Sequence, residues 1–350
     1  MDFESERDRL EPTVIVGPAQ RASGLPHPPP PAYAAIDLGT NNCRLLVARP
    51  AGGAFTVIDS FSRIIRLGEG LAETGRLSDA AIERAIACLR ICAGKLRRWN
   101  VRHGRFVATE ACRQAVNCDA FLRRAFAETG VQLEIISPGE EASLAARGCG
   151  PLLTSNRAFG IVFDIGGGST EVVWMGSRRG ESLAVLDTIS IPLGVVTAAD
   201  RLKGRDITPD LYAALKAEAR APLLAFDQRH GISAKVRGGR VQMLGASGTV
   251  TTVAGIHKRL SRYRRDIVDG AMLKFSEIDA VTDELFAVGP DGRRANPCVG
   301  PERADLVLPG CAILDAIRDQ WPVGRLRVAD RGVREGILLS LMARDRRRRR

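Results

Sequence analysis

The chain has 350 residues, of which 45% are hydrophobic and 26% charged, and its formal net charge is +11. This length accommodates two domains of ordinary size, and this composition is typical of a soluble globular protein. No apolar run is long enough to span a bilayer and the acidic N-terminus lacks the apolar core of a signal peptide, so we expect a cytoplasmic protein without membrane partners.

The two ends of the chain are compositionally biased. Residues 1–32 are rich in proline and show no periodic pattern, which predicts a disordered leader and a fold that starts at about Tyr33. Residues 344–350 are rich in arginine and predict a disordered tail. The basic surplus suggests an anionic partner, but aromatic residues make up only 5% and do not alternate with basic ones, so we expect no specific nucleic-acid partner.

The first motif lies in residues 34–47, where an apolar strand is followed by Asp37, a polar turn and a second strand. The turn contains Gly39, Thr40 and Asn41. Backbone N–H groups of such a turn can close around an anion, and an aspartate at the strand end can hold a divalent cation. An ordinary hairpin with a glycine turn explains this motif equally well when it is taken alone.

The next elements are a strand at about 56–67 and a helix that starts at Ser78 or Asp79 and ends near Trp99. This helix carries Cys88 and Cys92 one turn apart on its apolar side. Eight cysteines without a C-x-x-C pair favour neither a disulfide framework nor a zinc site. We therefore expect core thiols in a reducing compartment, with metal binding a remote alternative.

A short strand at 104–108 leads to a polar turn that carries Arg113. A guanidinium there could pair bidentately with a phosphate and neutralise charge that develops during its transfer. A surface ion pair is the more common role of an arginine, so both interpretations stay open. Beyond it we expect a helix at about 119–128 and a strand at 131–135.

Glu140 and Glu141 occupy the first turn of a helix that runs to Arg147. Acidic residues favour that position through the helix dipole whatever their function, and spacing alone favours this explanation. The alternative is that one of the two faces a cleft and orients or deprotonates a water.

The second motif, residues 160–174, repeats the first: a strand that ends near Asp164, a glycine-rich turn and a second strand that carries Glu171. The turn consists of Gly166, Gly167, Gly168 and Ser169. Neither G-x-G-x-x-G nor a Walker sequence is present, and a strand rather than a helix follows each turn. We therefore predict two facing hairpins from two similar domains that together clamp phosphate. Glu171 could be a ligand of metal or water, or a solvated side chain.

A third glycine turn follows a strand that starts at about Val241 and precedes a helix. Ser247 or Thr249 could cap this helix or touch a ligand together with Gly248, as at other anion sites on helix N-termini. The signal is weak when it is taken alone. The other elements that we expect in this half are helices at about 209–227, 304–317 and 334–343 and a strand at 325–328.

Taken together, these segments resemble the exopolyphosphatase and guanosine pentaphosphate phosphohydrolase family. The order and spacing match from about residue 34 to residue 341. The resemblance is carried by residues 37–41, 113–117, 136–142, 164–171, 245–249 and 330–336.

The resemblance implies an α/β fold of two RNase-H-like domains, as in actin, Hsp70 and sugar kinases, with the active site in the cleft between them. The expected domains are residues 33–155 and 156–329, and a C-terminal helix at about 330–343 returns to the first. Longer relatives append a helical HD-type domain. We expect none in this chain, which puts long-chain processivity in doubt.

The resemblance also implies hydrolysis of a terminal phosphoanhydride that depends on Mg²⁺, or on Mn²⁺ in its place. Glu141 would be the general base, with Arg113 and Glu171 as further catalytic residues, and Asp164, Asp37 and Glu171 would carry the metal. The expected phosphate ligands are Gly39, Thr40, Asn41, Arg113, Gly166, Gly167, Gly168, Ser169, Ser247 and Gly248. Such in-line attack needs positioning and charge neutralisation more than covalent chemistry.

Two substrates fit this family, inorganic polyphosphate and guanosine pentaphosphate. The basic surplus modestly favours polyphosphate.

The other hypotheses are an ATP-dependent kinase or chaperone ATPase, for which the chain leaves little room, and a non-catalytic binder of guanosine tetra- or pentaphosphate. The resemblance to the family also suggests a homodimer. Ala111-Cys112 and Pro138-Gly139 depart from the pairs common in relatives, and the first departure could alter hydrogen bonding beside Arg113.

Overall fold

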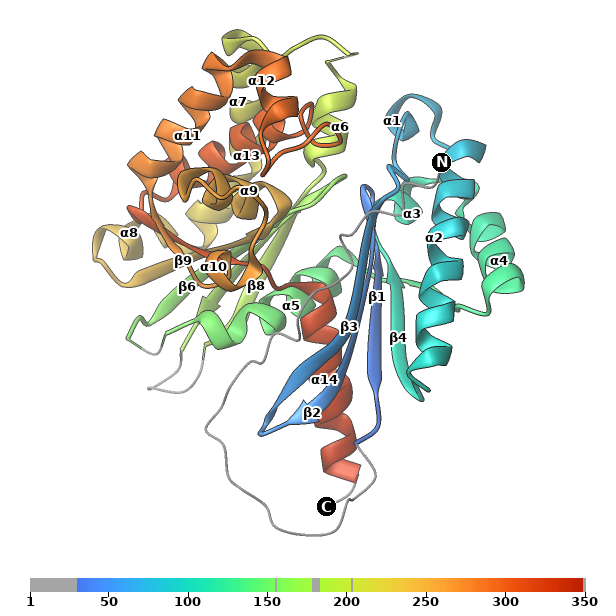
Figure 1. Cartoon of the computed structure of the whole chain (residues 1–350). Helices are drawn as coiled ribbons and strands as arrows, with labels where there is room; N and C mark the ends of the chain where they lie inside the picture. The colour runs from blue at the N-terminus through green and yellow to red at the C-terminus, as the bar shows by residue number, and fades with distance from the viewer. Residues whose placement is uncertain (1–29, 155, 178–182, 203, 349–350) are drawn as a thin grey trace.

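The computed structural model describes residues 30–154, 156–177, 183–202 and 204–348, which form two α/β halves, each built on its own mixed sheet (Figure 1). The first 29 residues of the predicted leader lie outside this range. None of the described helices is long and apolar enough to cross a membrane.

The first sheet has the strand order β3-β2-β1-β4-β5. Strands β1 to β3 form an antiparallel meander, and β4 and β5 continue from β1 in parallel. The strands are β1 (Tyr33–Leu38), β2 (Asn42–Ala51), β3 (Ala54–Ile64), β4 (His103–Ala108) and β5 (Glu134–Ile135). The strand expected at 131–135 is thus only two residues long, because just Val107 and Ala108 of β4 pair with it.

The second sheet repeats this arrangement. Its order is β10-β11-β9-β6-β7-β8, in which β6 to β8 form the antiparallel meander and β9 and β11 continue from β6 in parallel. The strands are β6 (Phe159–Ile165), β7 (Thr170–Gly176), β8 (Ala184–Ile191), β9 (Val241–Ser247), β10 (Met272–Lys274) and β11 (Arg325–Ala329). Apart from β10, the two sheets have the same topology.

Helices α2 (Asp79–Arg98) and α4 (Cys118–Thr129) pack on one face of the first sheet. The N-terminus of α2 lies where the sequence predicts it, because the Ser78 hydroxyl accepts a hydrogen bond from the backbone N–H of Ala81. Its apolar stripe, which includes Ile82, Ile86 and Leu89, is buried in the core that it shares with β1 and β2.

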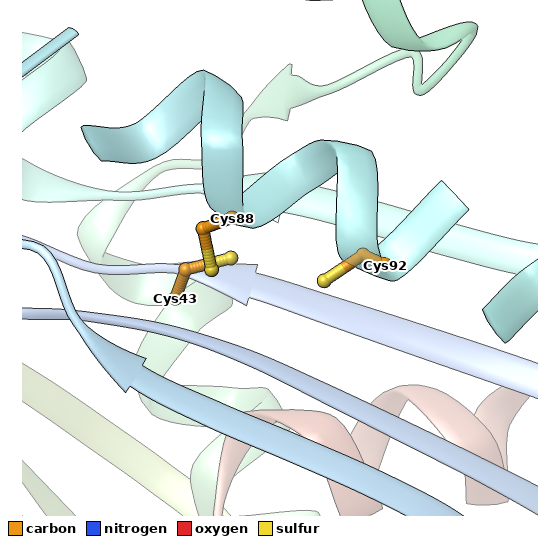
Figure 2. A group of neighbouring side chains, drawn as sticks. All are labelled: Cys43, Cys88 and Cys92. Atoms are coloured by element: carbon orange, nitrogen blue, oxygen red, sulfur yellow. The ribbon is translucent and has the colours of Figure 1, made fainter. Parts of the chain in front are cut away.

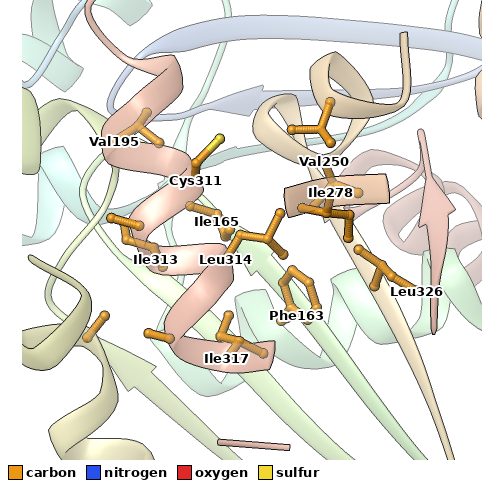
Figure 3. Packing of buried hydrophobic residues seen from close by; sticks show 14 of the residues in the cluster. Phe163, Ile165, Val195, Val250, Ile278, Cys311, Ile313, Leu314, Ile317 and Leu326 are labelled. Atoms are coloured by element: carbon orange, nitrogen blue, oxygen red, sulfur yellow. The ribbon is translucent and has the colours of Figure 1, made fainter. Parts of the chain in front are cut away.

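The second half has the larger core, centred on α13 (Val307–Gln320) (Figure 3). Almost the whole of α13 is buried, including Leu314 and Ile317, and its buried charged residues Asp315 and Arg318 pair with each other. It begins at Val307, three residues after the predicted start. The remaining helices are α1 (Leu71–Thr74), α3 (Glu110–Gln114), α6 (Val195–Asp200), α7 (Pro209–His230), α8 (Ile232–Arg237), α9 (Gly248–His257), α10 (Arg265–Val268), α11 (Phe275–Ala287) and α12 (Gly289–Ala295).

Two helices cross between the halves: α5 (Pro138–Cys149) and α14 (Val333–Arg348) (Figure 1). Glycines allow their close approach. A Cβ atom on Gly336 would lie 2.0 Å from the carbonyl oxygen of Leu144, and one on Gly148 would lie 2.1 Å from that of Gly332. Helix α5 packs against the second sheet and α14 against the first, so this crossing joins the two halves.

The predicted disordered tail is wrong over residues 344–348, because α14 continues to Arg348. Leu341 and Met342 are buried against the first sheet, and the hydroxyl of Tyr33 donates a 2.6 Å hydrogen bond to Asp345. Arginine is also a good helix former whose charge suits a helix C-terminus. Residues 349 and 350 lie outside the described range.

Candidate active site

A cleft lies where both glycine turns meet, and it encloses about 920 Å³ of space, part of it open solvent. One wall comes from the β1–β2 turn and from the start of α3, and the other from the β6–β7 turn and the N-terminus of α9. Each turn follows the central strand of its sheet, and the equivalent topology of the sheets therefore brings the turns face to face.

The two predicted phosphate turns touch each other. A Cβ atom on Gly167 would lie 2.9 Å from the backbone nitrogen of Asn41, and one on Gly168 would lie 2.7 Å from the hydroxyl of Thr40. Real Cβ atoms do not approach other atoms so closely, so glycine is required at both positions for the turns to meet.

Several backbone N–H groups in both turns have no hydrogen-bond partner among the described residues. The N–H groups of Thr40, Asn41, Gly167, Gly168 and Ser169 make no hydrogen bond with any described residue. Since buried backbone N–H groups are nearly always paired, five unpaired donors at one cleft indicate a binding place for an anion.

Two aspartates occupy equivalent positions in the two sheets. Asp37 is the penultimate residue of β1 and Asp164 that of β6, and both line the cleft. Glu141, from the first turn of α5, and Glu171, from β7, line the same cleft. The structure thus brings together all four of the carboxylates that the sequence singles out for metal binding or base catalysis.

Burial and mutual repulsion raise the pKa values of these carboxyl groups. Burial has the largest effect, and the neighbouring Glu171 adds to it, raising the pKa of Glu141 to about 8 although Arg113 opposes the shift. Burial raises the pKa of Asp164 to about 7 against the opposing charge of Arg44. The pKa of Glu171 is also about 7, raised by burial and opposed by hydrogen bonds from Ser169 and Ser190. Burial raises the pKa of Asp37 as well.

The donor atoms of this cleft fit a magnesium ion bound together with phosphate. The side-chain atoms that could coordinate the metal are oxygens. They include the carboxylate oxygens and the side-chain carbonyl oxygens of Asn41 and Asn42, which are buried without a hydrogen-bond partner among the described residues. No three of the described carboxylates bring oxygens within 4.8 Å of one another, so they form no closed cage. Mg²⁺ needs none, because it is commonly held by one or two carboxylates, waters and substrate phosphates.

Arg113 lies on helix α3, not on the turn that the sequence predicts, and it is not part of the cleft wall. The turn tightens into a helix because the backbone N–H groups of Cys112 and Arg113 both bond the Thr109 carbonyl. The guanidinium contacts Glu110 at 2.6 Å and Glu141 at 2.9 Å. In this state Arg113 therefore holds two carboxylates of the cleft and not a phosphate.

The residues of the third glycine turn have two different roles: one caps α9 and others line the cleft. The Ser247 hydroxyl accepts a hydrogen bond from the Val250 N–H at 3.0 Å and so caps α9, and Ser247 does not line the cleft. Gly248, Thr249 and Thr252 do line it. The prediction of Ser247 as a phosphate ligand is therefore not supported by its position, whereas Gly248 lies where it was expected.

Sequence reasoning missed two arginines of the cleft, Arg44 and Arg303. Neither guanidinium makes an ion pair or hydrogen bond with a described residue, and burial together with the charge of Arg44 lowers the pKa of Arg303. Two unpaired like charges that line one cleft indicate an anionic ligand. Arg44 could have been identified from the sequence, because side chains two residues apart on a strand lie on the same face and Asn42 belongs to the first turn. Arg303 lies in a loop and is brought to the cleft only by the tertiary fold.

Residues 46–345 match the sequence profile of the Ppx/GppA phosphatase family. The chain belongs to this family. It is an exopolyphosphatase-like phosphatase, which confirms the resemblance that the motifs carry. Sequence reasoning thus identified the family correctly, together with its hydrolase class.

Individual relatives agree with this assignment. A putative exopolyphosphatase of Haemophilus influenzae is 29% identical over 311 residues, which cover 88% of this chain and 90% of that one. The crystal structure of the Aquifex aeolicus member of the Ppx/GppA family has a TM-score of 0.73 at 28% identity, with 90% of this chain and 98% of that one covered. An exopolyphosphatase from Cytophaga hutchinsonii, at 22% identity, shares the fold with a TM-score of 0.79 over 89% of this chain and 98% of that one.

Proposed function

We propose that this phosphatase releases the terminal phosphate of inorganic polyphosphate in a reaction that depends on Mg²⁺ and on Glu141 as general base. The observation that carries the proposal is the pair of touching turns with five unpaired N–H donors beside four carboxylates. The repeated strand order also supports two RNase-H-like domains, related to those of actin and sugar kinases, around the cleft.

In this proposal the N–H groups of the two turns hold the terminal phosphoryl group between them. Bound Mg²⁺, held by Asp37 and Asp164 with Glu171 nearby, would supply positive charge to neutralise the phosphoryl oxygens. Arg44 and Arg303 bind the adjoining phosphates, because they are the cleft's cations without a described partner.

Glu141 accepts the proton of the attacking water at its carboxylate. Its raised pKa makes it a better base than an ordinary glutamate once it is ionised. The 2.9 Å contact with the guanidinium of Arg113 orients this carboxylate and favours its ionised form. Phosphoryl transfer of this kind needs positioning and charge neutralisation, and no nucleophilic side chain is required.

The experiment is phosphate release by the purified protein with Mg²⁺, with long-chain polyphosphate and guanosine pentaphosphate assayed side by side. We expect release from polyphosphate that is lost on removal of Mg²⁺ and in Glu141→Gln. Faster release from guanosine pentaphosphate would assign the alternative substrate to the same mechanism. Binding of both substrates without release would overturn the hydrolase proposal and leave a sensor of these anions.

A further inference from the structure

Three buried cysteines form a cluster outside the catalytic cleft. Cys43 belongs to β2, and Cys88 and Cys92 belong to α2; Figure 2 shows their side chains in the space between strand and helix. The three sulfur atoms all lie within 4.8 Å of one another, and none of the three residues is exposed to solvent. Sequence reasoning identified the two helix cysteines as core thiols but gave no reason to join Cys43 to them.

The alternation of β2 separates this cluster from the cleft. Asn42 and Arg44 line the cleft and Cys43 does not, so its side chain points to the opposite face of the sheet. Helix α2 covers that face, and residues four positions apart on a helix lie on the same side. Cys88 and Cys92 therefore both meet Cys43 across the helix–sheet interface.

The donor set is sulfur alone. The cysteines lie in an apolar core with residues such as Ala85 and Leu89, and no described histidine or carboxylate belongs to the group. Oxygen-preferring cations such as Mg²⁺ are disfavoured by such donors, and structural zinc calls for a fourth ligand that the group does not contain. Thiolate sulfurs suit Cu(I), a soft cation.

The spacing of the sulfurs suits one central ion. Three sulfurs that surround a cation at about 2.3 Å lie about 4 Å apart in a trigonal arrangement. Because the three sulfurs already lie within 4.8 Å of one another, only small rotations of the side chains are needed to reach this spacing.

Cys88 is the member of the cluster whose pKa is lowered. Hydrogen bonds from Cys43 and Cys92, with a smaller contribution from Arg63, lower the pKa of Cys88. The same interactions raise the pKa of Cys43. Buried cysteines often act merely as small apolar side chains, as Cys311 can in the other half, but that role does not require three sulfurs within 4.8 Å of one another.

We propose that Cys43, Cys88 and Cys92 form a three-sulfur site for one soft monovalent cation of the Cu(I) type. Binding forms three copper–sulfur bonds and releases the protons of the thiols to solvent, and no electron is transferred because copper enters already reduced. The positive charges of copper and of Arg63 partly offset those of the three thiolates.

The test is an anaerobic titration of the reduced full-length protein with Cu(I) against a chromophoric Cu(I) chelator. We expect one tightly held equivalent and a near-ultraviolet thiolate-to-copper absorption. Cys92→Ala should weaken the binding at least tenfold, whereas Cys311→Ala, which removes an equally buried thiol elsewhere, should leave it unchanged. Equal affinities of the two variants, or no retention by the wild type, would overturn the site.

A second measurement needs no variant. X-ray absorption at the copper edge of the loaded wild-type protein should show three sulfur neighbours and no nitrogen or oxygen. Two sulfurs, four sulfurs or a mixed donor set would contradict the proposal even if Cys92→Ala failed to fold.

Discussion

The carboxyl groups of the cleft are held in a state that disfavours their own ionisation. Burial raises the pKa of each, and like charges on Asp37, Glu141, Asp164 and Glu171 add to the effect. A protein maintains such an arrangement only at a cost to its stability, which a bound cation would offset. The residues that destabilise the empty cleft are thus those that would bind the metal and the water.

Glu141→Gln tests the general base. The change keeps the size of the side chain and its bond to Arg113 but removes the proton acceptor, so the rate of phosphate release should fall about 100- to 10,000-fold. Glu140→Gln is the matched control, because the neighbouring Glu140 pairs with Arg105 and does not line the cleft. Similar rates for the two variants would mean that the base lies elsewhere.

Arg303→Ala tests the anion subsite. We expect the KM for polyphosphate to rise at least tenfold, because an unpaired cation is lost from the cleft wall, while the melting temperature stays the same or rises because repulsion from Arg44 is relieved. Arg259→Ala, which removes an exposed cation paired with Glu284, is the control and should change neither value. A lower melting temperature with an unchanged KM would indicate a purely structural arginine.

The raised pKa values predict how the stability of the metal-free protein depends on pH. Folded-state values of about 8 for Glu141 and about 7 for Asp164 exceed those of the unfolded chain, so the folded state binds more protons. These carboxyl groups contribute their full stabilisation of the folded state below about pH 4, and this contribution is lost as the pH rises through 7 and 8. Melting temperatures in EDTA should therefore fall from pH 5 to pH 8, less steeply in Glu141→Gln than in Glu140→Gln. Identical slopes would contradict the assignment.

At the scale of elements, the crossing of α5 and α14 depends on glycine. Gly336→Ala would place a Cβ atom 2.0 Å from the carbonyl of Leu144, and we expect a loss of about 2–3 kcal/mol in the free energy of unfolding. Gly94→Ala is the control: this glycine in α2 has no atom within 4 Å of the added Cβ, so the change should be neutral or should stabilise by about 0.5–1 kcal/mol. Denaturant unfolding of both variants measures the difference.

Elements whose signals are local were predictable from the sequence. The strand–turn–strand units around Asp37 and Asp164 and the capped start of α2 follow from alternation, glycine turns and a serine cap, and the structure contains them. Elements set by tertiary packing were not predictable: α3 replaces an expected turn, and α14 extends beyond its predicted end because the first sheet covers it. The same limit applies to the cleft, where Arg303 carries no local signal.

At the scale of the whole molecule, two similar sheets are joined through helices that cross between them. The face of the first sheet that includes Ala35 and Leu46 is covered by Ile337 and Leu338, about 300 residues later in the chain. The larger core of the second half is drawn from residues 161–328, and the other face of its sheet is covered by α5, which precedes that sheet in the chain. The two halves therefore differ in how far each depends on the rest of the chain.

Removal of residues 333–350 tests this difference. The first sheet should lose its native packing, because Ala35 and Leu46 would be exposed to water, whereas the second half should keep its protected amides. Hydrogen exchange followed by mass spectrometry on the truncated protein locates the loss. Uniform protection of both halves would show that α14 is dispensable for the first sheet.

The late position of α14 also bears on synthesis at the ribosome. The second half has emerged almost completely, and its core can close, while one face of the first sheet still lacks the helix that covers it. Proteins fold from the N-terminus as domains become available, but here the N-terminal half is the last to be completed. A newly made chain therefore exposes this apolar face of the first sheet until α14 has emerged from the ribosome, and during this interval the exposed face favours aggregation.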